Sequence, residues 1–256
     1  MLLLAFFGAL PVSSQPTAGF SLEEGEELVY NVRYAFIDLG QVRIRTGKNV
    51  KSDGSVTVQT KGFIDSYDGV PFADLHATYE SWIDTAIFTR RFVGKAKDSD
   101  EWRFSRYVFD YEQVRVLMES GKKDTIVSQR DTMTITPPMQ DGLSLLFSAR
   151  KHVHSRRAMN IPAIIERKNV NTYINFTGKR TSVEIDAVEY PIDVIEFEGI
   201  AEFVGIFGLT GDFEGWFSND NARVPIMANM KVIIGSITLE LMEWKRAGWA
   251  PPRAKE

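Results

Sequence analysis

Residues 26–36 read EELVYNVRYAF, and apolar side chains fall on every second position of this stretch, at Leu28, Tyr30, Val32, Tyr34 and Phe36. Polar or charged side chains stand between them, at Glu27, Asn31 and Arg33. Successive side chains of a β-strand point to opposite faces of a sheet, so this period of two predicts a strand with one buried face and one wet face.

Similar strand patterns recur along the rest of the chain. They occupy residues 42–50, 55–64, 75–83 and 88–94, and return after residue 102 and again after residue 163. Turn sequences such as Asp53-Gly54 separate them. Short strands with turns about every 8 to 12 residues predict an all-β fold. We expect a mainly antiparallel, strongly curved sheet, arranged as a sandwich or a partly closed barrel.

Residues 140–152, QDGLSLLFSARKH, have helical spacing instead, with the repeat at Leu143, Leu146, Phe147 and Arg150. Asp141 suits the N-cap, and the basic Lys151 and His152 suit the negative end of the helix dipole. An apolar stripe on one helix needs a sheet face to bury it. We therefore expect one covering α-helix near 141–151.

The N-terminal residues predict a processing segment. Residues 2–12, LLLAFFGALPV, are uncharged and shorter than the roughly 20 residues that span a bilayer, and small residues follow where signal peptidase cuts. We expect a signal peptide over 1–14 and a periplasmic or secreted protein, with a buried N-terminal strand or helix as the alternative. A linker over 15–24, a single β domain over 25–246 and a disordered tail over 247–256 complete the predicted organisation.

Composition and charge exclude several classes of protein. With 30 Lys and Arg against 34 Asp and Glu, the net charge of -4 gives no basic field for nucleic acid. The absence of cysteine removes disulfides, thiol catalysis and cysteine-bound metals. We expect no cofactor, no bound metal, no nucleic-acid partner and no transmembrane span.

Three stretches resemble a known family. Residues 205–244 read GIFGLTGDFEGWFSNDNARVPIMANMKVIIGSITLELMEW, residues 25–30 read GEELVY, and residues 140–150 contain the expected helix. The glycine-rich turn, the Trp-Phe-Ser-Asn-Asp, Arg-Val-Pro and Ile-Gly-Ser-Ile motifs and the opening Gly-Glu-x-Leu-x-Tyr strand are similar to the exported bacterial family catalogued as domain of unknown function 3108. The resemblance implies an envelope or secreted location and a mainly antiparallel β fold, and it brings no catalytic residues.

Asp212, Glu214 and Asp220 are the candidate catalytic residues. A glycosidase needs two carboxylates about 5 to 10 Å apart, and Asp212 and Glu214 would share one strand face at roughly 7 Å. Acids that alternate with aromatics are also typical of any half-exposed strand, and residues 218–221, SNDN, are typical of a turn. An envelope glycan hydrolase is therefore the alternative function.

Basic side chains follow the predicted helix, at Arg150, Lys151, Arg156 and Arg157. They form a candidate anion site for lipid headgroups or phosphorylated glycans. A solvated helix end explains the same charge run, and we prefer that interpretation.

The sequence favours a non-enzymatic protein over an enzyme, since no set of catalytic residues converges. A curved sheet with one helix can enclose a lined cavity. We expect such a cavity to bind an apolar or amphipathic ligand, or the sheet to bind a partner protein; a lipid, a glycan or an envelope protein are the candidate partners. The candidate lining is Tyr30, Tyr34, Phe36, Phe147, Phe213 and Trp216. A scaffolding role in envelope assembly is a further alternative, and the oligomeric state is open.

Overall fold

The computed structural model describes residues 20–52, 55–70, 74–136, 138–201, 211–232 and 235–255. The signal peptide expected over 1–14 and the first part of the expected linker lie outside the described residues. In the described ranges, no helix has the length and apolar character needed to span a membrane.

The described residues form a 16-stranded sheet. Its first half contains β1 (Glu27–Tyr34), β2 (Ile37–Ser52), β3 (Ser55–Ser66), β4 (His76–Asp84), β5 (Thr89–Asp98), β6 (Glu101–Asp110), β7 (Arg115–Lys122) and β8 (Ile126–Thr134). Its second half contains β9 (Gln140–Asp141), β10 (Ala158–Ile165), β11 (Lys168–Asn175), β12 (Arg180–Val183), β13 (Ile192–Ala201), β14 (Gly211–Ser218), β15 (Pro225–Lys231) and β16 (Ser236–Lys245).

Neighbouring strands follow the chain order almost throughout. The sheet runs β8-β7-β6-β5-β4-β3-β2-β1-β16-β15-β14-β13-β11-β10-β9, with β12 added beside β13. Every pair is antiparallel except the short pair of β9 and β10. The first strand pairs with the last, with Leu28 opposite Trp244. The pairing of β1 with β16 therefore joins the two halves of the sheet.

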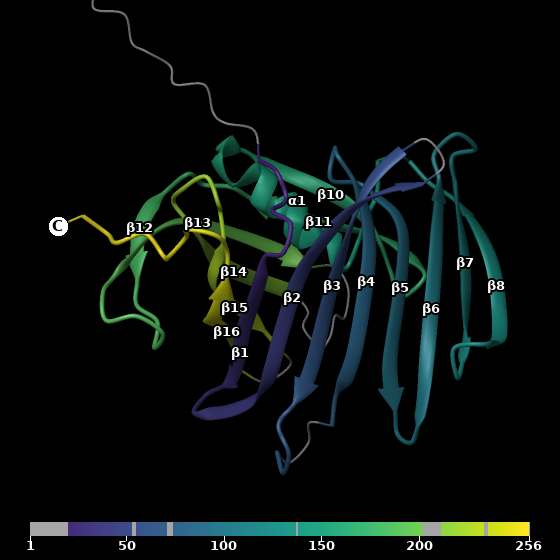
Figure 1. Ribbon diagram of the computed structural model, residues 1–256, viewed down its shortest axis with the longest axis horizontal. Helices are drawn as coiled ribbons and strands as arrows, with labels where there is room; N and C mark the ends of the chain where they lie inside the picture. Colours follow the sequence, from purple (N-terminus) through teal and green to yellow (C-terminus); the bar gives the residue numbers. More distant parts are fainter. Residues whose placement is uncertain are drawn as a thin grey trace, which may run out of the picture.

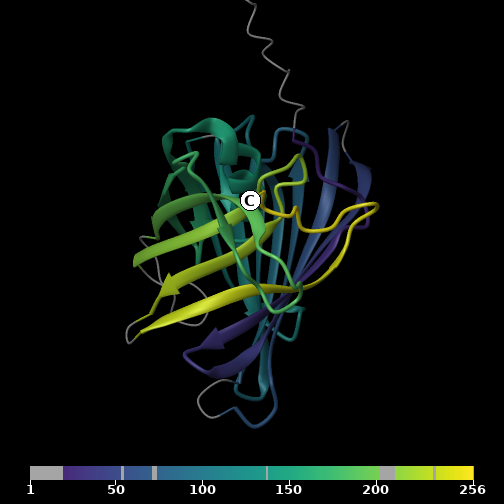
Figure 2. The same ribbon diagram turned by 90° about the vertical axis from the view of Figure 1, so that its left-hand side faces the viewer.

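The sheet is strongly curved, and its end strands β8 and β9 do not pair with each other. Strands β13 to β16 run across the direction of β2 to β5 (Figures 1 and 2). The turn between β10 and β11 reaches the first half of the sheet, where the Arg167 amide donates to the Tyr107 hydroxyl (3.2 Å) and its Nη1 to Ser120 Oγ (2.5 Å). The expected mainly antiparallel, curved and partly closed sheet is confirmed.

One α-helix, α1 (Ser144–His152), lies among the described residues and continues into a short 3-10 helix, η1 (Val153–Ser155). It occupies the same end of the molecule as β10 (Figure 1). The expected helix began at 141, whereas Asp141 belongs to β9. Its Oδ1 nevertheless accepts hydrogen bonds from the amides of Leu143 (2.7 Å) and Ser144 (3.0 Å), which satisfies donors at the helix start as an N-cap does.

The C-terminal segment, which the sequence predicts to be disordered over 247–256, is held through residue 254 against the start of β13 and the two residues before it. Trp249 Nε1 donates to Asp220 Oδ2 (2.7 Å), and the Asp193 amide donates to the Pro252 carbonyl (2.8 Å). Trp249 also meets Trp244 edge to face, with ring centroids 5.9 Å apart. A partly buried aromatic ring and backbone hydrogen bonds therefore order a segment whose polar and proline-rich composition favours disorder.

Candidate functional site

The concave face of the sheet encloses a cavity of about 550 Å³. Ligand sites for small molecules occupy roughly 300 to 1,000 Å³. The first half of the sheet lines it with side chains that share one face, among them Tyr30, Val42, Ile64 and Phe92. The second half contributes Phe197, Phe213 and Met227 across the cavity. The alternation read from the first strand therefore builds an apolar interior.

Helix α1 closes the cavity on one side. Leu145, Leu146 and Ala149 line it from the helix, and Leu143 lines it from the position just before the helix. On the facing strand, Gly62 offers no side chain, and a Cβ there would have ordinary contact with the Leu143 side chain, at 3.4 Å, and with Tyr79 Cβ, at 4.0 Å. The space between helix and sheet therefore depends on a small residue in the middle of β3.

Aromatic rings lie flat over glycines on the opposite wall. Gly215 on β14 pairs directly with Phe197 on β13, and a Cβ on Gly215 would stand 2.6 Å from Cε1 and Cζ of the Phe197 ring. Gly199 has the same relation to the ring of Phe213. These glycines let large rings cover the sheet without filling the cavity.

Three cations among the lining residues are exposed and paired. Lys95 Nζ lies 2.6 Å from Asp124 Oδ2, Arg103 Nε lies 2.5 Å from Asp98 Oδ2, and Lys231 pairs with Asp212. Their side chains are 37%, 58% and 65% exposed, whereas the apolar lining is mostly buried. The cavity therefore meets solvent where its charged residues lie.

The lining also contains two acidic residues: Asp212, the partner of Lys231, and Glu166, in the turn between β10 and β11. Within the described ranges the Glu166 carboxylate has neither an ion-pair nor a hydrogen-bond partner. Burial, and after it the charge of Glu166, raises the pKa of Tyr79 to about 12. The same charge opposes ionisation of Tyr107, whose pKa is raised mainly by burial. The carboxylate is therefore a solvent-exposed, unpaired charge on the same lining as two tyrosines.

A second polar group on the wall also lacks a partner. Thr172 on β11 lines the cavity and is 4% exposed, and its Oγ1 has no hydrogen-bond partner among the described residues. Buried hydroxyls are nearly always hydrogen-bonded in folded proteins. A bound molecule or an ordered water is the natural source of that partner.

Two of the expected lining aromatics, Tyr30 and Phe213, do line the cavity. The Tyr30 hydroxyl donates to the Pro225 carbonyl (3.0 Å), and the Tyr30 ring lines the cavity. Phe147 is fully buried and packs in the core with Leu28 and Ile83 instead of lining the cavity.

The other expected aromatics lie elsewhere. Tyr34 packs at the far end of β1 with Val32 and Leu39. Trp216 follows the opposite parity to Phe213 on β14 and packs against a different part of the core. Phe36 is 90% exposed at the tip of the hairpin between β1 and β2. Strand alternation continues to Tyr34, and the turn then carries Phe36 out of the sheet.

The three candidate acids do not converge. Asp212 pairs with Lys231, and Glu214 Oε1 accepts from Asn229 Nδ2 (3.1 Å). Asp220 lies beyond the opposite end of β14 from Asp212, about 26 Å along an extended chain. It accepts hydrogen bonds from the Ser218 hydroxyl, the Trp249 ring and the amides of Ala222 and Arg223. Each acid therefore has a partner in the fold.

The basic residues after the helix also have separate environments. Arg150 is 1% exposed, and Lys151 Nζ donates to the Ala86 carbonyl (2.8 Å). Arg156 and Arg157 are solvent-exposed. The four cations therefore do not form one surface.

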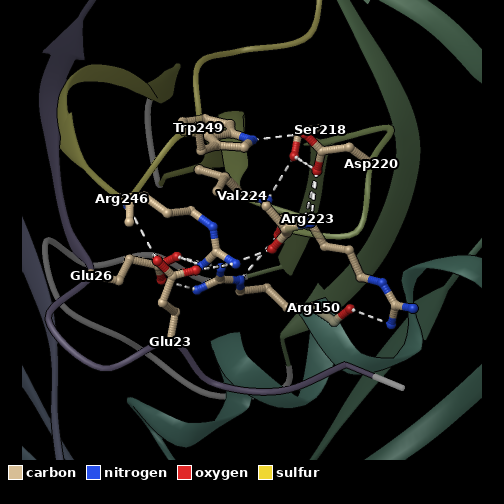
Figure 3. Close-up of polar contacts among 11 residues, drawn as sticks. Glu23, Glu26, Arg150, Ser218, Asp220, Arg223, Val224, Arg246 and Trp249 are labelled. Atoms are coloured by element: carbon tan, nitrogen blue, oxygen red, sulfur yellow. Dashed lines mark hydrogen bonds and ion pairs between the residues drawn. The ribbon is translucent and has the colours of Figure 1, made fainter. Parts of the chain in front are cut away.

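Arg150 lies in a buried ion cluster with Glu26 and Arg246 (Figure 3). Its Nη1 and Nη2 donate to the two carboxylate oxygens of Glu26, at 2.5 and 3.0 Å, and its Nε to the Arg223 carbonyl (3.0 Å). Arg246 also pairs with Glu23 (2.7 Å). The cluster ties α1 to the segment before β1 and to the end of β16, and sequence spacing gives no sign of it.

A buried carboxylate fixes the start of α1. Asp141 is fully buried, and its Oδ2 accepts from the hydroxyls of Ser81 and Thr89 (2.7 Å for Thr89). Burial raises the pKa of Asp141 against the effect of these hydrogen bonds. The helix that closes the cavity is therefore attached to β4 and β5.

Comparisons with known proteins identify a family and a solved structure of similar fold. The family model described as Protein of unknown function (DUF3108) matches residues 29–242. A beta-barrel-like protein of domain of unknown function DUF1849 from Brucella abortus is similar in fold, with 10% identity, 87% of this chain and 97% of that chain covered, and a TM-score of 0.59. A protein with a YmcC-like fold from Bacteroides fragilis has 8% identity, 89% and 99% coverage, and a TM-score of 0.38. No curated protein matches the sequence.

Proposed function

Since the chain belongs to the DUF3108 family, a family of unknown function, we propose from its own geometry that it is a non-enzymatic binding protein for an apolar or amphipathic molecule. The observation that carries the proposal is the cavity of about 550 Å³, which is apolar inside and charged where it meets solvent. An apolar ligand that leaves water gains roughly 25 cal/mol for each Å² of buried apolar surface. A preformed cavity adds little ordering cost to that gain.

The proposal places the protein beyond the cytoplasmic membrane. Its support is the uncharged apolar run of residues 2–12, followed by Ser13 and Ser14. Expression in a bacterial host, cell fractionation and N-terminal sequencing test it. A mature chain that begins near Gln15 and lies outside the cytoplasm is expected; an uncut chain in the cytoplasm contradicts export.

Ligand binding is tested with the neutral fluorescent probe N-phenyl-1-naphthylamine and a variant that fills the cavity. Gly62→Leu adds a side chain to the lining, where a Cβ has ordinary contacts with Leu143 and Tyr79 and no closer neighbour. Lys61→Leu is the matched control, because it adds the same side chain to the opposite face of β3.

Saturable probe fluorescence is expected for the wild type and for Lys61→Leu. We expect Gly62→Leu to weaken probe binding by about tenfold or more, while the circular dichroism spectrum of the variant stays that of the wild type. Absence of probe binding to the wild type, or equal binding by a folded Gly62→Leu, contradicts the proposal. Native mass spectrometry of protein purified from its own cells then identifies a molecule that copurifies.

A further inference from the structure

The charges around the cavity balance except at one residue. Lys95, Arg103 and Lys231 each have an acidic partner in the fold. Glu166 has no such partner among the described residues, although it lines the same cavity. An unpaired carboxylate beside an apolar cavity attracts a cation and repels an anion.

The backbone holds Glu166 in place at the wall. Ile165 pairs with Lys168, so Glu166 and Arg167 form the two-residue turn between β10 and β11, and both have positive φ, 48° and 66°. Arg167 is anchored to Tyr107, Ser120 and Asp131 on the facing strands. The anchored arginine leaves its neighbour Glu166 as the unpaired group of the turn.

Aromatic rings line the same cavity as this carboxylate, and one of them, Tyr107, accepts a hydrogen bond from the amide of the next residue, Arg167. The Tyr79 ring stacks on Phe92 at 6.1 Å between centroids, and Phe92 stacks on Tyr107 at 5.1 Å. All three rings line the cavity, and the Tyr79 hydroxyl has no partner within the described part of the chain. Aromatic rings and a carboxylate together suit an ammonium group, which gains from both the ring electrons and the negative charge.

We infer that the ligand is an amphiphile whose polar end carries an ammonium group held at Glu166, with its apolar part directed toward α1. This inference rests on the proposed ligand-binding function. Glu166 sets the preference for the charge of the polar end, and the apolar lining contributed by Leu145, Leu146 and Ala149 receives the tail.

The test uses three amphiphiles with the same alkyl chain: decylamine, decanol and decanoate, each below its micelle concentration. Each competes with N-phenyl-1-naphthylamine for the purified full chain at pH 7, where the amine is protonated and the acid ionised. The variant is Glu166→Gln, which keeps the shape and removes the charge. Glu112→Gln, at an exposed turn between β6 and β7, is the control for net charge.

We expect decylamine to displace the probe at a roughly fivefold lower concentration than decanoate, as befits a partly exposed ion pair. Glu166→Gln removes that difference and leaves decanol unchanged, whereas Glu112→Gln retains it. Equal displacement by all three compounds, or a preference for decanoate, overturns the inference while ligand binding stands. If the probe itself does not bind the wild type, the proposed function fails, and this inference fails with it.

Discussion

Arg150 and Glu26 hold each other through two hydrogen bonds, although 124 residues separate them. Their side chains are 1% and 2% exposed. The pair joins the helix beside the cavity to the entry of the first strand, and Arg246 joins the last strand to the same carboxylate. Removing one partner of a buried ion pair leaves a buried charge, which is costly.

Arg150→Met tests how much this ion pair contributes to the stability of the fold. The substitution keeps an unbranched, flexible apolar stem and removes the guanidinium group with its charge and five donors. We expect the free energy of unfolding, measured with urea, to fall by about 3 kcal/mol. Arg130→Met, at an ion pair whose arginine is 71% exposed, should change it by less than about 1 kcal/mol. Equal losses of stability in the two variants would show that the buried pair contributes no more than an exposed one.

Acid should weaken the same cluster. Burial alone would raise the pKa of Glu26, but hydrogen bonds and charges from Arg150 and Arg246 outweigh it, so its pKa lies below the ordinary value of 4.5. A carboxyl group with a lowered pKa stabilises the fold above its unfolded pKa and loses that contribution as the pH falls through its folded pKa. As the pH is lowered past about 4.5, the urea concentration at the unfolding midpoint of the wild type should therefore decrease. The decrease should be less steep in Glu26→Gln. Parallel pH curves for the two proteins would contradict this.

Gly215→Ala tests the ring that lies over the glycine. The added methyl group overlaps the Phe197 ring, so we expect a loss of about 1 to 3 kcal/mol in stability. In a Phe197→Leu background the same change should cost less, because the ring is gone. A double-mutant cycle measures this coupling. Purely additive losses would place the strain in the backbone instead.

Trp249→Ala tests whether the C-terminal segment belongs to the fold. The substitution removes the contact with Trp244 and the hydrogen bond to Asp220, and we expect a loss of about 2 kcal/mol in thermal or urea unfolding. Trp102→Ala, at a ring that is 42% exposed on β6, provides a comparison at a tryptophan outside this segment. An unchanged stability in Trp249→Ala would mean that the tail contributes nothing.

Strand alternation was enough to predict the curved sheet, because a period of two reports directly which face is buried. It also placed Tyr30 and Phe213 on the inner face. It failed at Phe36, since a turn residue no longer follows the parity of its strand. Phe147 has the right spacing for the helix stripe, but the stripe is wide enough for one side chain to enter the core and another to line the cavity.

The sequence pattern could not predict contacts between residues that lie far apart in the chain. Arg150 looked like one of several cations at a helix end, and only the fold brings Glu26 to it. Glu166 gave no signal, because its place in the cavity lining depends on the turn between β10 and β11. Local periodicity reports burial, whereas partnership between charges depends on which strands become neighbours.

The pairing of β1 with β16 also has a consequence for biosynthesis. The first strand emerges from the ribosome early but finds one of its two neighbours only when the last strand has been made. Until then one edge of β1 stays open to pairing with other chains, a recognised route to aggregation. The finished sheet also brings the entry and exit of the chain side by side, which favours circular permutation with new ends in another surface turn.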